Sequence, residues 1–421
     1  MLNTRPLDSF EPLGVNLLKP QYTYSFGNIP NTIYTMLTGE QNGPLLPVDC
    51  FGGSYPQPEK VVLFFIDALG WKFWQDHLQD IAPMRRIAEN GVLTPISSLF
   101  PSTTSAAVST MNLGVLPAEH ACYEWNLYVP AYGETIQSLP FAPLGKRQSD
   151  ACLEKGYDPR ALFAVHETVH QRLAAQGVRS LLFENQSYAK GAVNQIFNAG
   201  AELYEYSTLA ESLTQLKEAL ATVKGKAWFN VYWGGIDHIG HRYGPSTPYF
   251  DAEIISFWAT FDALLRNLNS PNTLYLFTAD HGQVSAPIED TFYINERIPA
   301  LADCLSTSPT GNVIYPGGSP RDLFMHVKSE RREEAFTQLT EALTDIAHVM
   351  TVDDAVTQGL FGPSGVGAEL RRRLGDILVL PFDGHFVYWR EPGVLHHDFS
   401  GHHGGLAASE LITVLGATEE L

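Results

Sequence analysis

The segment Val61-Val-Leu-Phe-Phe-Ile-Asp67 is a continuous apolar run that ends in a carboxylate. A run without polar residues at alternate positions is typical of a strand buried on both faces, as in a parallel sheet. The same pattern recurs at Ala227-Trp-Phe-Asn-Val-Tyr-Trp233, which precedes Asp237, and at Leu274-Tyr-Leu-Phe-Thr-Ala-Asp280. Three expected strands therefore end in, or just before, an aspartate.

Helical patterns separate the expected strands. This alternation predicts an α/β fold with a mostly parallel central sheet and helices on both faces. Ligands of such sheets bind outside the carboxyl ends of the strands, where the three aspartates would lie. Shorter strands are expected at residues 180–183, 377–380 and 411–415, and helices at residues 84–90, 104–113, 159–176, 209–223 and 251–268.

The pattern divides the chain into three parts. Residues 1–58 are rich in Pro, Gly and Asn with weak periodicity, and we interpret them as an irregular N-terminal arm. Residues 59–297 and 374–421 form the predicted core, to which the chain returns with a strand in 375–380. Residues 298–373 are predicted to be a small α+β insertion, with a strand at 321–327 and a helix at 330–347.

The composition limits the possible partners. A formal net charge of −19 argues against binding to duplex nucleic acid or to an anionic membrane. It would also repel an anionic substrate unless local cations reversed the field, which is a first indication of metal ions. The four cysteines form no C-x-x-C pair, and the N-terminus lacks the pattern of a signal peptide. We therefore expect a cytoplasmic protein without transmembrane segments.

Two motifs combine aspartate with histidine. In Asp237-His-Ile-Gly-His241-Arg-Tyr-Gly-Pro245 the carboxylate and the second imidazole share one face of a helical turn, a spacing that suits a divalent ion such as zinc. The alternative is a surface turn with a capping aspartate. In Thr278-Ala-Asp280-His281-Gly282 a turn at the glycine would bring both side chains to one ion, whereas the alternative is a helix cap beside an exposed histidine.

Two further segments carry hydroxyl and imidazole groups. Phe100-Pro-Ser-Thr-Thr104-Ser-Ala-Ala107 is a hydroxyl-rich turn that leads into a helix, whose N-terminus favours anions. Such hydroxyls commonly cap helices, and one can cap while its neighbour attacks a substrate. The Gly-rich segment Gly401-His402-His403-Gly404-Gly405 offers two possible ligands, and His396 and His397 compete for the same role.

Taken together, these residues supply the acidic, imidazole and hydroxyl ligands that a two-metal site requires from several strand ends. Their order resembles the alkaline phosphatase superfamily, and most closely its type I phosphodiesterase/nucleotide pyrophosphatase family. The resemblance covers residues 60–290 and 375–416, so the core would be a metallohydrolase. The matching segments are Phe65-Ile-Asp67, Phe100-Pro-Ser-Thr-Thr104, Asp237-x-x-Gly-His241-x-x-Gly-Pro245, Thr278-Ala-Asp280-His281-Gly282 and His403-Gly404.

The resemblance implies two divalent metal ions, expected to be Zn²⁺, and a ligand set for each. One zinc would be held by Asp237, His241 and His403. We choose His403 because it directly precedes a glycine, with His402 as the alternative. The ligands implied for the second zinc are Asp67, Asp280 and His281, together with the nucleophile.

Thr104, rather than Thr103, corresponds to the nucleophile of the family and would form a covalent phospho-threonine. Asn126 is the candidate for the family's oxyanion-binding asparagine, although its spacing from the nucleophile is shifted by one residue. The chain also departs from the family after the nucleophile. Ser105-Ala-Ala-Val108 replaces the usual Pro-Asn-His, so substrate contacts of that stretch are not carried over.

The implied activity is hydrolysis of a phosphodiester, a pyrophosphate or a related phosphate ester in a small molecule or nucleotide. The same metal site would also suit a phosphonoacetate-type phosphonate hydrolase or a phosphomonoesterase. A threonine nucleophile argues against the related phosphoglycerate mutases, which use serine. An alternative of another class is a non-catalytic binding module that zinc stabilises.

Overall fold

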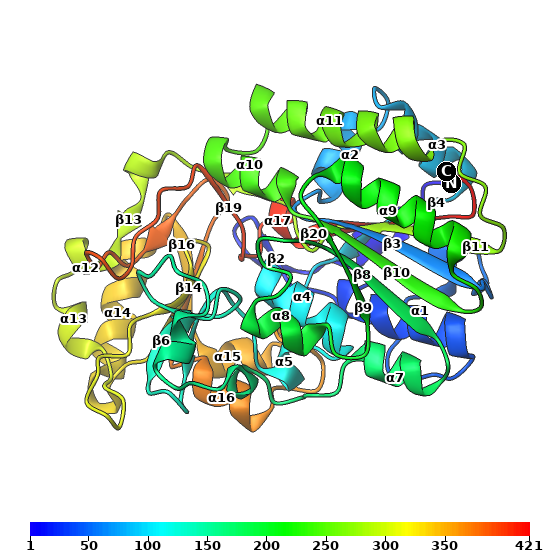
Figure 1. The fold of residues 1–421 in the computed structure, drawn as a ribbon. Coiled ribbons are helices and arrows are strands. Elements are labelled where there is room, and N and C mark those ends of the chain that lie inside the picture. The colour runs from blue at the N-terminus through cyan, green and yellow to red at the C-terminus, as the bar shows by residue number, and fades with distance from the viewer.

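A seven-stranded sheet forms the centre of the computed structural model, which describes residues 1–421 (Figure 1). Five neighbouring strands run parallel, while β20 runs antiparallel to both of its neighbours, β11 and β4. The predicted fold class is thus confirmed. The strands, in spatial order, are β4 (Val92–Ser97), β20 (Ile412–Thr418), β11 (Thr273–Thr278), β3 (Lys60–Ile66), β10 (Ala227–Trp233), β8 (Arg179–Asn185) and β9 (Glu202–Tyr206).

Helices cover both faces of this sheet (Figure 1). Each helical layer buries its apolar face against one face of the sheet, and two large hydrophobic clusters result. One layer contains α2 (Trp71–His77), α3 (Ala82–Asn90), α9 (Leu209–Thr222), α10 (Gly235–Tyr243) and α11 (Pro248–Leu265). The other contains α1 (Ile29–Thr38), α4 (Thr104–Leu113) and α7 (Val169–Ala175).

The N-terminal region is more regular than the sequence predicted. Helix α1 lies within residues 1–58, which we expected to be an irregular arm. Ile29, Ile33 and Leu37 are fully buried, and they pack in the same cluster as Val61 of β3. Burial of this apolar face stabilises the helix despite the Pro and Gly residues around it.

The chain also forms a second, smaller sheet of four antiparallel strands, with the order β14-β15-β17-β16. β17, which we expected to return to the core, pairs here with β15 and β16. An apolar run predicts a buried strand but not which sheet receives it. We propose that the small α+β unit includes β17. Its elements are β14 (Gly317–Ser319), β15 (Asp322–Met325), α14 (Arg332–Leu343), β16 (Ala347–Thr351), α15 (Val352–Thr357), α16 (Ala368–Arg373) and β17 (Ile377–Pro381).

Other differences from the sequence prediction lie at edges and connections. The expected helix at 159–176 is a 3-10 turn, Pro159–Leu162, followed by α7. β4 contains a proline and edge strand β9 alternates polar residues, so neither gave a continuous apolar signal. The remaining short elements are β1 (Pro12–Gly14), β2 (Leu17–Leu18), α5 (Pro117–His120), β5 (Asn126–Val129), β6 (Glu134–Gln137), β7 (Ala142–Pro143), α6 (Ala151–Glu154), α8 (Ala192–Phe197), β12 (Val284–Ser285), β13 (Phe292–Tyr293), α12 (Ile294–Arg297), α13 (Leu301–Cys304), β18 (Val387–Tyr388), β19 (Gly401–His402) and α17 (Ala408–Leu411).

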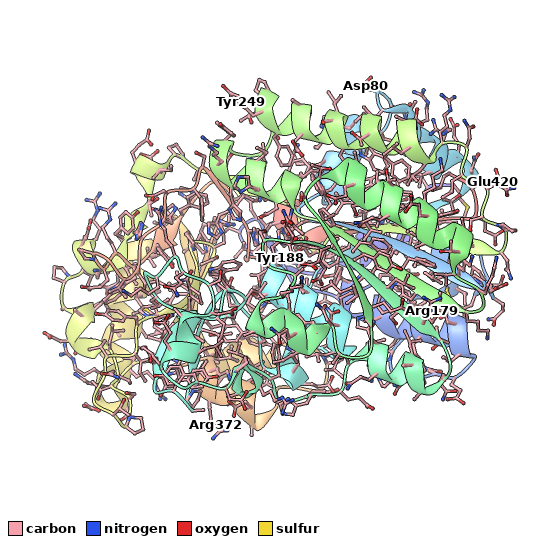
Figure 2. The ribbon with its side chains drawn as sticks, viewed as in Figure 1. Asp80, Arg179, Tyr188, Tyr249, Arg372 and Glu420 are labelled. Carbon is pink, nitrogen blue, oxygen red and sulfur yellow. The ribbon has the colours of Figure 1, made fainter.

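The outer surface is rich in charged side chains. Asp80, Arg372 and Glu420 all lie on the outside of the molecule (Figure 2). The N- and C-termini lie close together at one end of the central sheet (Figure 1). None of the helices combines the length and the apolar character that crossing a bilayer would require.

Candidate active site

Three aspartates gather at the carboxyl edge of the central sheet. Asp67 follows β3, Asp280 follows β11, and Asp237 lies in the first turn of α10, after β10. Because β3 pairs in parallel with both β10 and β11, the ends of these three strands are neighbours. Asp67 and Asp280 are 2% and 0% exposed. The structure thus brings together the carboxylates that the strand pattern predicted to converge.

The loops after β3 and β11 approach each other closely. A Cβ atom on Gly70 would lie 2.7 Å from the Cα of Gly282, so only glycine fits at this contact. The backbone N–H of Ala68 donates to Asp280 Oδ1 at 3.2 Å. These contacts fix Asp280 beside the loop that carries Asp67.

Asp67, Asp280 and His281 form one group of possible metal ligands, in which one atom of each residue lies within 4.8 Å of the others. His281 Nε2 is 3.5 Å from Asp67 Oδ1 and 3.4 Å from Asp280 Oδ2. Asp67 Oδ1 and Asp280 Oδ2 are buried and have no hydrogen-bond donor. Buried carboxylate oxygens without a donor are costly unless a cation contacts them.

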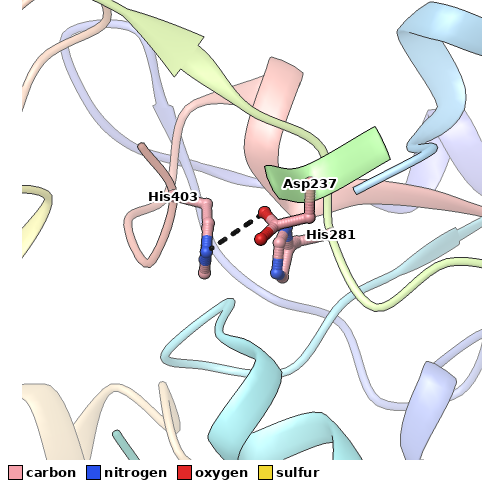
Figure 3. A group of neighbouring side chains, drawn as sticks. All are labelled: Asp237, His281 and His403. Carbon is pink, nitrogen blue, oxygen red and sulfur yellow. Dashed lines mark ion pairs between the residues drawn. The ribbon is translucent and has the colours of Figure 1, made fainter. Parts of the chain in front are cut away.

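Asp237, His281 and His403 form a second, adjacent group (Figure 3). His403 Nε2 is 3.7 Å from Asp237 Oδ1, and the rings of His281 and His403 stack with centroids 3.5 Å apart. His241 Nε2 lies 3.4 Å from Asp237 Oδ2, on the same side of α10 as expected from the spacing. His281 therefore lies between the two groups.

The other histidines near the site are placed differently. His402 lines the cavity and its ring centroid is 5.0 Å from that of His241, but it belongs to neither ligand group. His397 is buried, and its Nε2 lies 2.9 Å from Thr291 Oγ1. His396 is exposed at the rim of the cavity.

Hydrogen bonds set the orientation of the clustered histidines. Nδ1 of His241 is 2.8 Å from the carbonyl oxygen of Gly401, and Nδ1 of His281 is 2.9 Å from that of Gly282. Nδ1 of His403 is likewise 3.0 Å from a carbonyl oxygen, that of Ser102. A carbonyl only accepts, so Nδ1 carries the hydrogen in each ring and the lone pair is on Nε2. This arrangement is typical of metal-binding histidines.

The charges of the cluster also suit cations. Burial raises the pKa of Asp67, and the nearby Asp280 and Asp237 carboxylates raise it further. Burial lowers the pKa of His281 and that of His403, so these rings are neutral at physiological pH. Three carboxylates beside neutral imidazoles leave an excess of negative charge with both oxygen and nitrogen donors. The residues therefore fit two borderline divalent cations such as Zn²⁺.

Thr103 and Thr104 both lie at the start of α4, but their hydroxyl groups have different contacts. Thr103 is the N-cap of α4, and its side chain accepts from the backbone N–H of Ala106 at 3.3 Å. Thr104 is the first helical residue, and its Oγ1 lies 3.3 Å from His281 Nε2 and 3.5 Å from Asp67 Oδ2. The Thr104 hydroxyl thus faces the ligand cluster while its neighbour caps the helix.

Two residues of the site were missed by the sequence analysis. Tyr232 Oη donates a hydrogen bond to Asp67 Oδ2, and Gln283 Nε2 donates to Asp237 Oδ1. Each holds one oxygen of a clustered carboxylate and leaves the other for a cation. Tyr232 lies near the end of β10, opposite Phe65 of β3. The sequence signal that could have identified Tyr232 is its hydroxyl group near the end of a strand that was expected to lie in the same sheet as the strand ending at Asp67.

Asn126, at the start of β5, lies in the wall of the same cavity as Thr104. Its Nδ2 is 3.1 Å from Tyr388 Oη and 3.3 Å from the carbonyl oxygen of Gly318. Both partners line the same cavity. The predicted oxyanion role would require the amide to exchange one of these partners.

A cavity of about 550 Å³ opens in front of Thr104, between the edge of the central sheet and the small sheet. Its volume suits a small molecule. Two loops form its outer wall and touch, because a Cβ on Gly145 would lie 2.0 Å from the carbonyl oxygen of Gly393. Other lining residues include Glu124, Trp125, Lys146, Arg147 and Phe399.

A mostly parallel sheet, with clustered aspartates and histidines at its carboxyl edge beside a helix-start threonine, is an alkaline-phosphatase-like arrangement. Residues 61–406 match the type I phosphodiesterase/nucleotide pyrophosphatase family, and the chain belongs to it. Membership confirms the predicted family, which is described as type I phosphodiesterases and nucleotide pyrophosphatases.

Solved structures share this fold. Murine ectonucleotide pyrophosphatase/phosphodiesterase 5 superposes with a TM-score of 0.63 at 15% identity, covering 85% of this chain and 87% of that chain. Phosphonoacetate hydrolase from Sinorhizobium meliloti, in complex with phosphonoformate, superposes with a TM-score of 0.60 at 16% identity, covering 86% and 91%.

A sequence relative is the GPI ethanolamine phosphate transferase 2 of Aspergillus oryzae, which is 26% identical over 149 residues, or 34% of this chain. The chain spans only about 15% of the length of that relative.

Proposed function

We propose that the chain hydrolyses phosphodiester or pyrophosphate bonds of small molecules, with Thr104 as the nucleophile and two divalent cations as cofactors. The observation that carries this proposal is the convergence of Asp67, Asp237 and Asp280 beside the Thr104 hydroxyl. A metal site that only stabilises the fold would not need a free hydroxyl at the position of Thr104. A hydroxyl that faces two ligand groups and does not cap its helix is suited to attack.

The first ligand set is one of the two groups, and the second differs from the other group by having His241, whose Nε2 is 3.4 Å from Asp237 Oδ2, in place of His281. Asp67, Asp280 and His281 would hold one cation, while Asp237, His241 and His403 would hold the other. When bound, two divalent cations lower the pKa of a neighbouring hydroxyl and offset the charge of a phosphate. Zn²⁺ is the expected ion, because mixed carboxylate and imidazole ligands suit it.

The protein's own groups would then act on the substrate as follows. Thr104 Oγ1 gives its proton to solvent and forms a bond to phosphorus, while the bond from phosphorus to the leaving-group oxygen breaks and that oxygen leaves as an anion or takes a proton from water. The N-terminus of α4, at which Thr104 is the first helical residue, would favour the negative charge of a phosphate bound there. Water then cleaves the bond between Thr104 Oγ1 and phosphorus, which releases phosphate or a phosphate monoester and restores the hydroxyl. Asn126 is the proposed donor to the phosphate oxygens.

The relatives support this chemistry for the family. An inactive variant of the murine enzyme, in which alanine replaces a threonine, was solved in complex with AMP. The Sinorhizobium enzyme was solved with phosphonoacetate. A phosphonoacetate-type activity is therefore the second candidate, since the same fold holds a substrate with a carbon–phosphorus bond.

A panel of substrates would separate these candidates. We expect the zinc-loaded protein to cleave a nitrophenyl phosphodiester with a higher kcat/KM than nitrophenyl phosphate or phosphonoacetate. The expectation rests on the family match and the Asp237-x-x-Gly-His241 motif. Release of nitrophenolate and of inorganic phosphate measures the three reactions. A clear preference for phosphonoacetate would replace the proposed activity, and no turnover of any ester would exclude it.

Removal of one ligand should release one metal ion. Replacement of His241 by alanine is expected to lower the zinc content by one ion per chain, because this ring is fixed with Nε2 toward Asp237. His238 lies on the same helix but is exposed, so His238→Ala is the matched control and should keep both ions. Elemental analysis after dialysis measures the content. Equal zinc in both variants would contradict the ligand assignment.

A further inference from the structure

A second pair of carboxylates lies on the small-sheet side of the cavity. Glu124 precedes β5 and is 1% exposed, and Asp322 begins β15 and is 0% exposed. The two carboxyl groups lie close enough that each shifts the pKa of the other. Glu124 also lines the cavity together with Thr103, Thr104 and Ser105. The pair is distinct from the two ligand groups, neither of which contains it.

The contacts of the pair leave one buried oxygen atom, Asp322 Oδ2, without a partner. Asp322 Oδ1 accepts from the backbone N–H of Ser319 at 3.2 Å and from the Ser319 hydroxyl. Asp322 Oδ2 is buried and has no donor. One oxygen of Glu124, Oε2, accepts from the backbone N–H of Trp125. The unpartnered Asp322 oxygen therefore needs a positively charged or hydrogen-donating partner.

No cationic side chain offsets the charge of this pair. Arg321 is next to Asp322 in sequence, but its guanidinium binds Glu410 and the carbonyl oxygens of Phe382 and His385. The buried Arg373 likewise donates to other carbonyl oxygens and to Glu369. Two adjacent carboxylates in this setting require either a shared proton or a bound cation.

We propose that Glu124 and Asp322 form a third cation site, which takes a hydrated divalent ion such as Mg²⁺ or Mn²⁺. The site offers only oxygen ligands, which hard cations prefer, and no imidazole as zinc would favour. Mg²⁺ commonly binds through one or two carboxylates and keeps several waters, and the adjoining cavity has room for them. The ion would enter through the cavity, past Glu124.

Such an ion would change the field in the cavity. It would place positive charge on the wall opposite the two ligand groups, where the net charge of the chain otherwise disfavours an anion. Burial raises the pKa of Glu124, so binding of the cation should release a proton from the pair.

The test is a titration of the full-length, zinc-saturated protein with Mn²⁺. Free Mn²⁺ is followed by electron paramagnetic resonance and the zinc content by elemental analysis. We expect one Mn²⁺ to bind per chain with the zinc content unchanged, and Mg²⁺ to compete for it. Glu124→Gln and Asp322→Asn should each weaken Mn²⁺ binding by at least about tenfold, as expected for loss of one of few ligands.

Asp398→Asn is the matched control, because Asp398 lines the same cavity but is exposed. It should leave Mn²⁺ binding unchanged. If the wild-type protein bound no third ion, the proposal would be overturned, and Glu124 and Asp322 would instead share a proton. This result does not depend on whether the variants fold. Wild-type binding of Mn²⁺ that neither variant weakens would overturn it as well. Neither outcome depends on the Thr104 chemistry.

Discussion

Replacement of Thr104 by alanine is expected to lower kcat for a nitrophenyl phosphodiester by at least about 1000-fold, as for removal of other catalytic nucleophiles. Alanine has no oxygen with which to form the covalent bond to phosphorus. Fold and zinc content should persist, because Thr104 Oγ1 has only two loose contacts, at 3.3 and 3.5 Å. Steady-state kinetics, thermal unfolding and elemental analysis of one preparation measure all three properties.

Two variants control this experiment. Thr104→Ser keeps a hydroxyl and should recover part of the activity. Thr103→Ala removes the N-cap of α4, which should cost about 1 kcal/mol of stability while most of the activity remains. If Thr104→Ala retained most of the activity, or if Thr103→Ala lost as much, the assignment of the nucleophile would be wrong.

The central part of the fold could be predicted from the sequence because its signals are local. The apolar runs of β3, β10 and β11 identify strands buried on both faces, and each is followed by an aspartate. Parallel strands of one sheet share a carboxyl edge, so their aspartates converge whatever the details of packing. This geometry also explains why the sequence alone groups Asp67, Asp237 and Asp280.

Other features depend on tertiary contacts that no local pattern contains. β17 has the same apolar character as a core strand, yet it pairs in the small sheet. Tyr232 and Gln283 contact carboxylates of the cluster through their position on neighbouring elements. The pairing of Glu124 with Asp322 joins segments nearly two hundred residues apart. The order of residues along the chain does not show which distant segments come into contact in the folded protein.

The largest loss of stability is expected from breaking the ion pair of Arg321 with Glu410. Both side chains are fully buried, with Arg321 Nη2 2.7 Å and Nε 3.2 Å from the carboxylate. Arg321→Met should lower the free energy of unfolding by about 3–5 kcal/mol, because it leaves the Glu410 charge uncompensated. Denaturant unfolding followed by intrinsic fluorescence measures the change.

The exposed pair of Arg179 with Glu202 provides a matched control (Figure 2). It has the same two-pronged geometry, at 2.7 and 2.8 Å, but its side chains are 43% and 47% exposed. Arg179→Met should therefore cost no more than about 1 kcal/mol. The double variant Arg321→Met/Glu410→Gln should be less destabilised than the sum of its single changes, because it leaves no buried charge unpaired.

The same ion pair connects stability to the proposed active site. Glu410 accepts from the backbone N–H groups of Gly405 and Ala407, at 3.1 and 3.0 Å, and so holds the loop that carries His403. Folded Arg321→Met should consequently bind zinc more weakly, while Arg179→Met should not. Equal losses of stability and of zinc affinity in the two variants would show that burial of the pair has no such effect. If Arg321→Met lowered the stability but left the zinc affinity unchanged, Arg321 would have only a structural role.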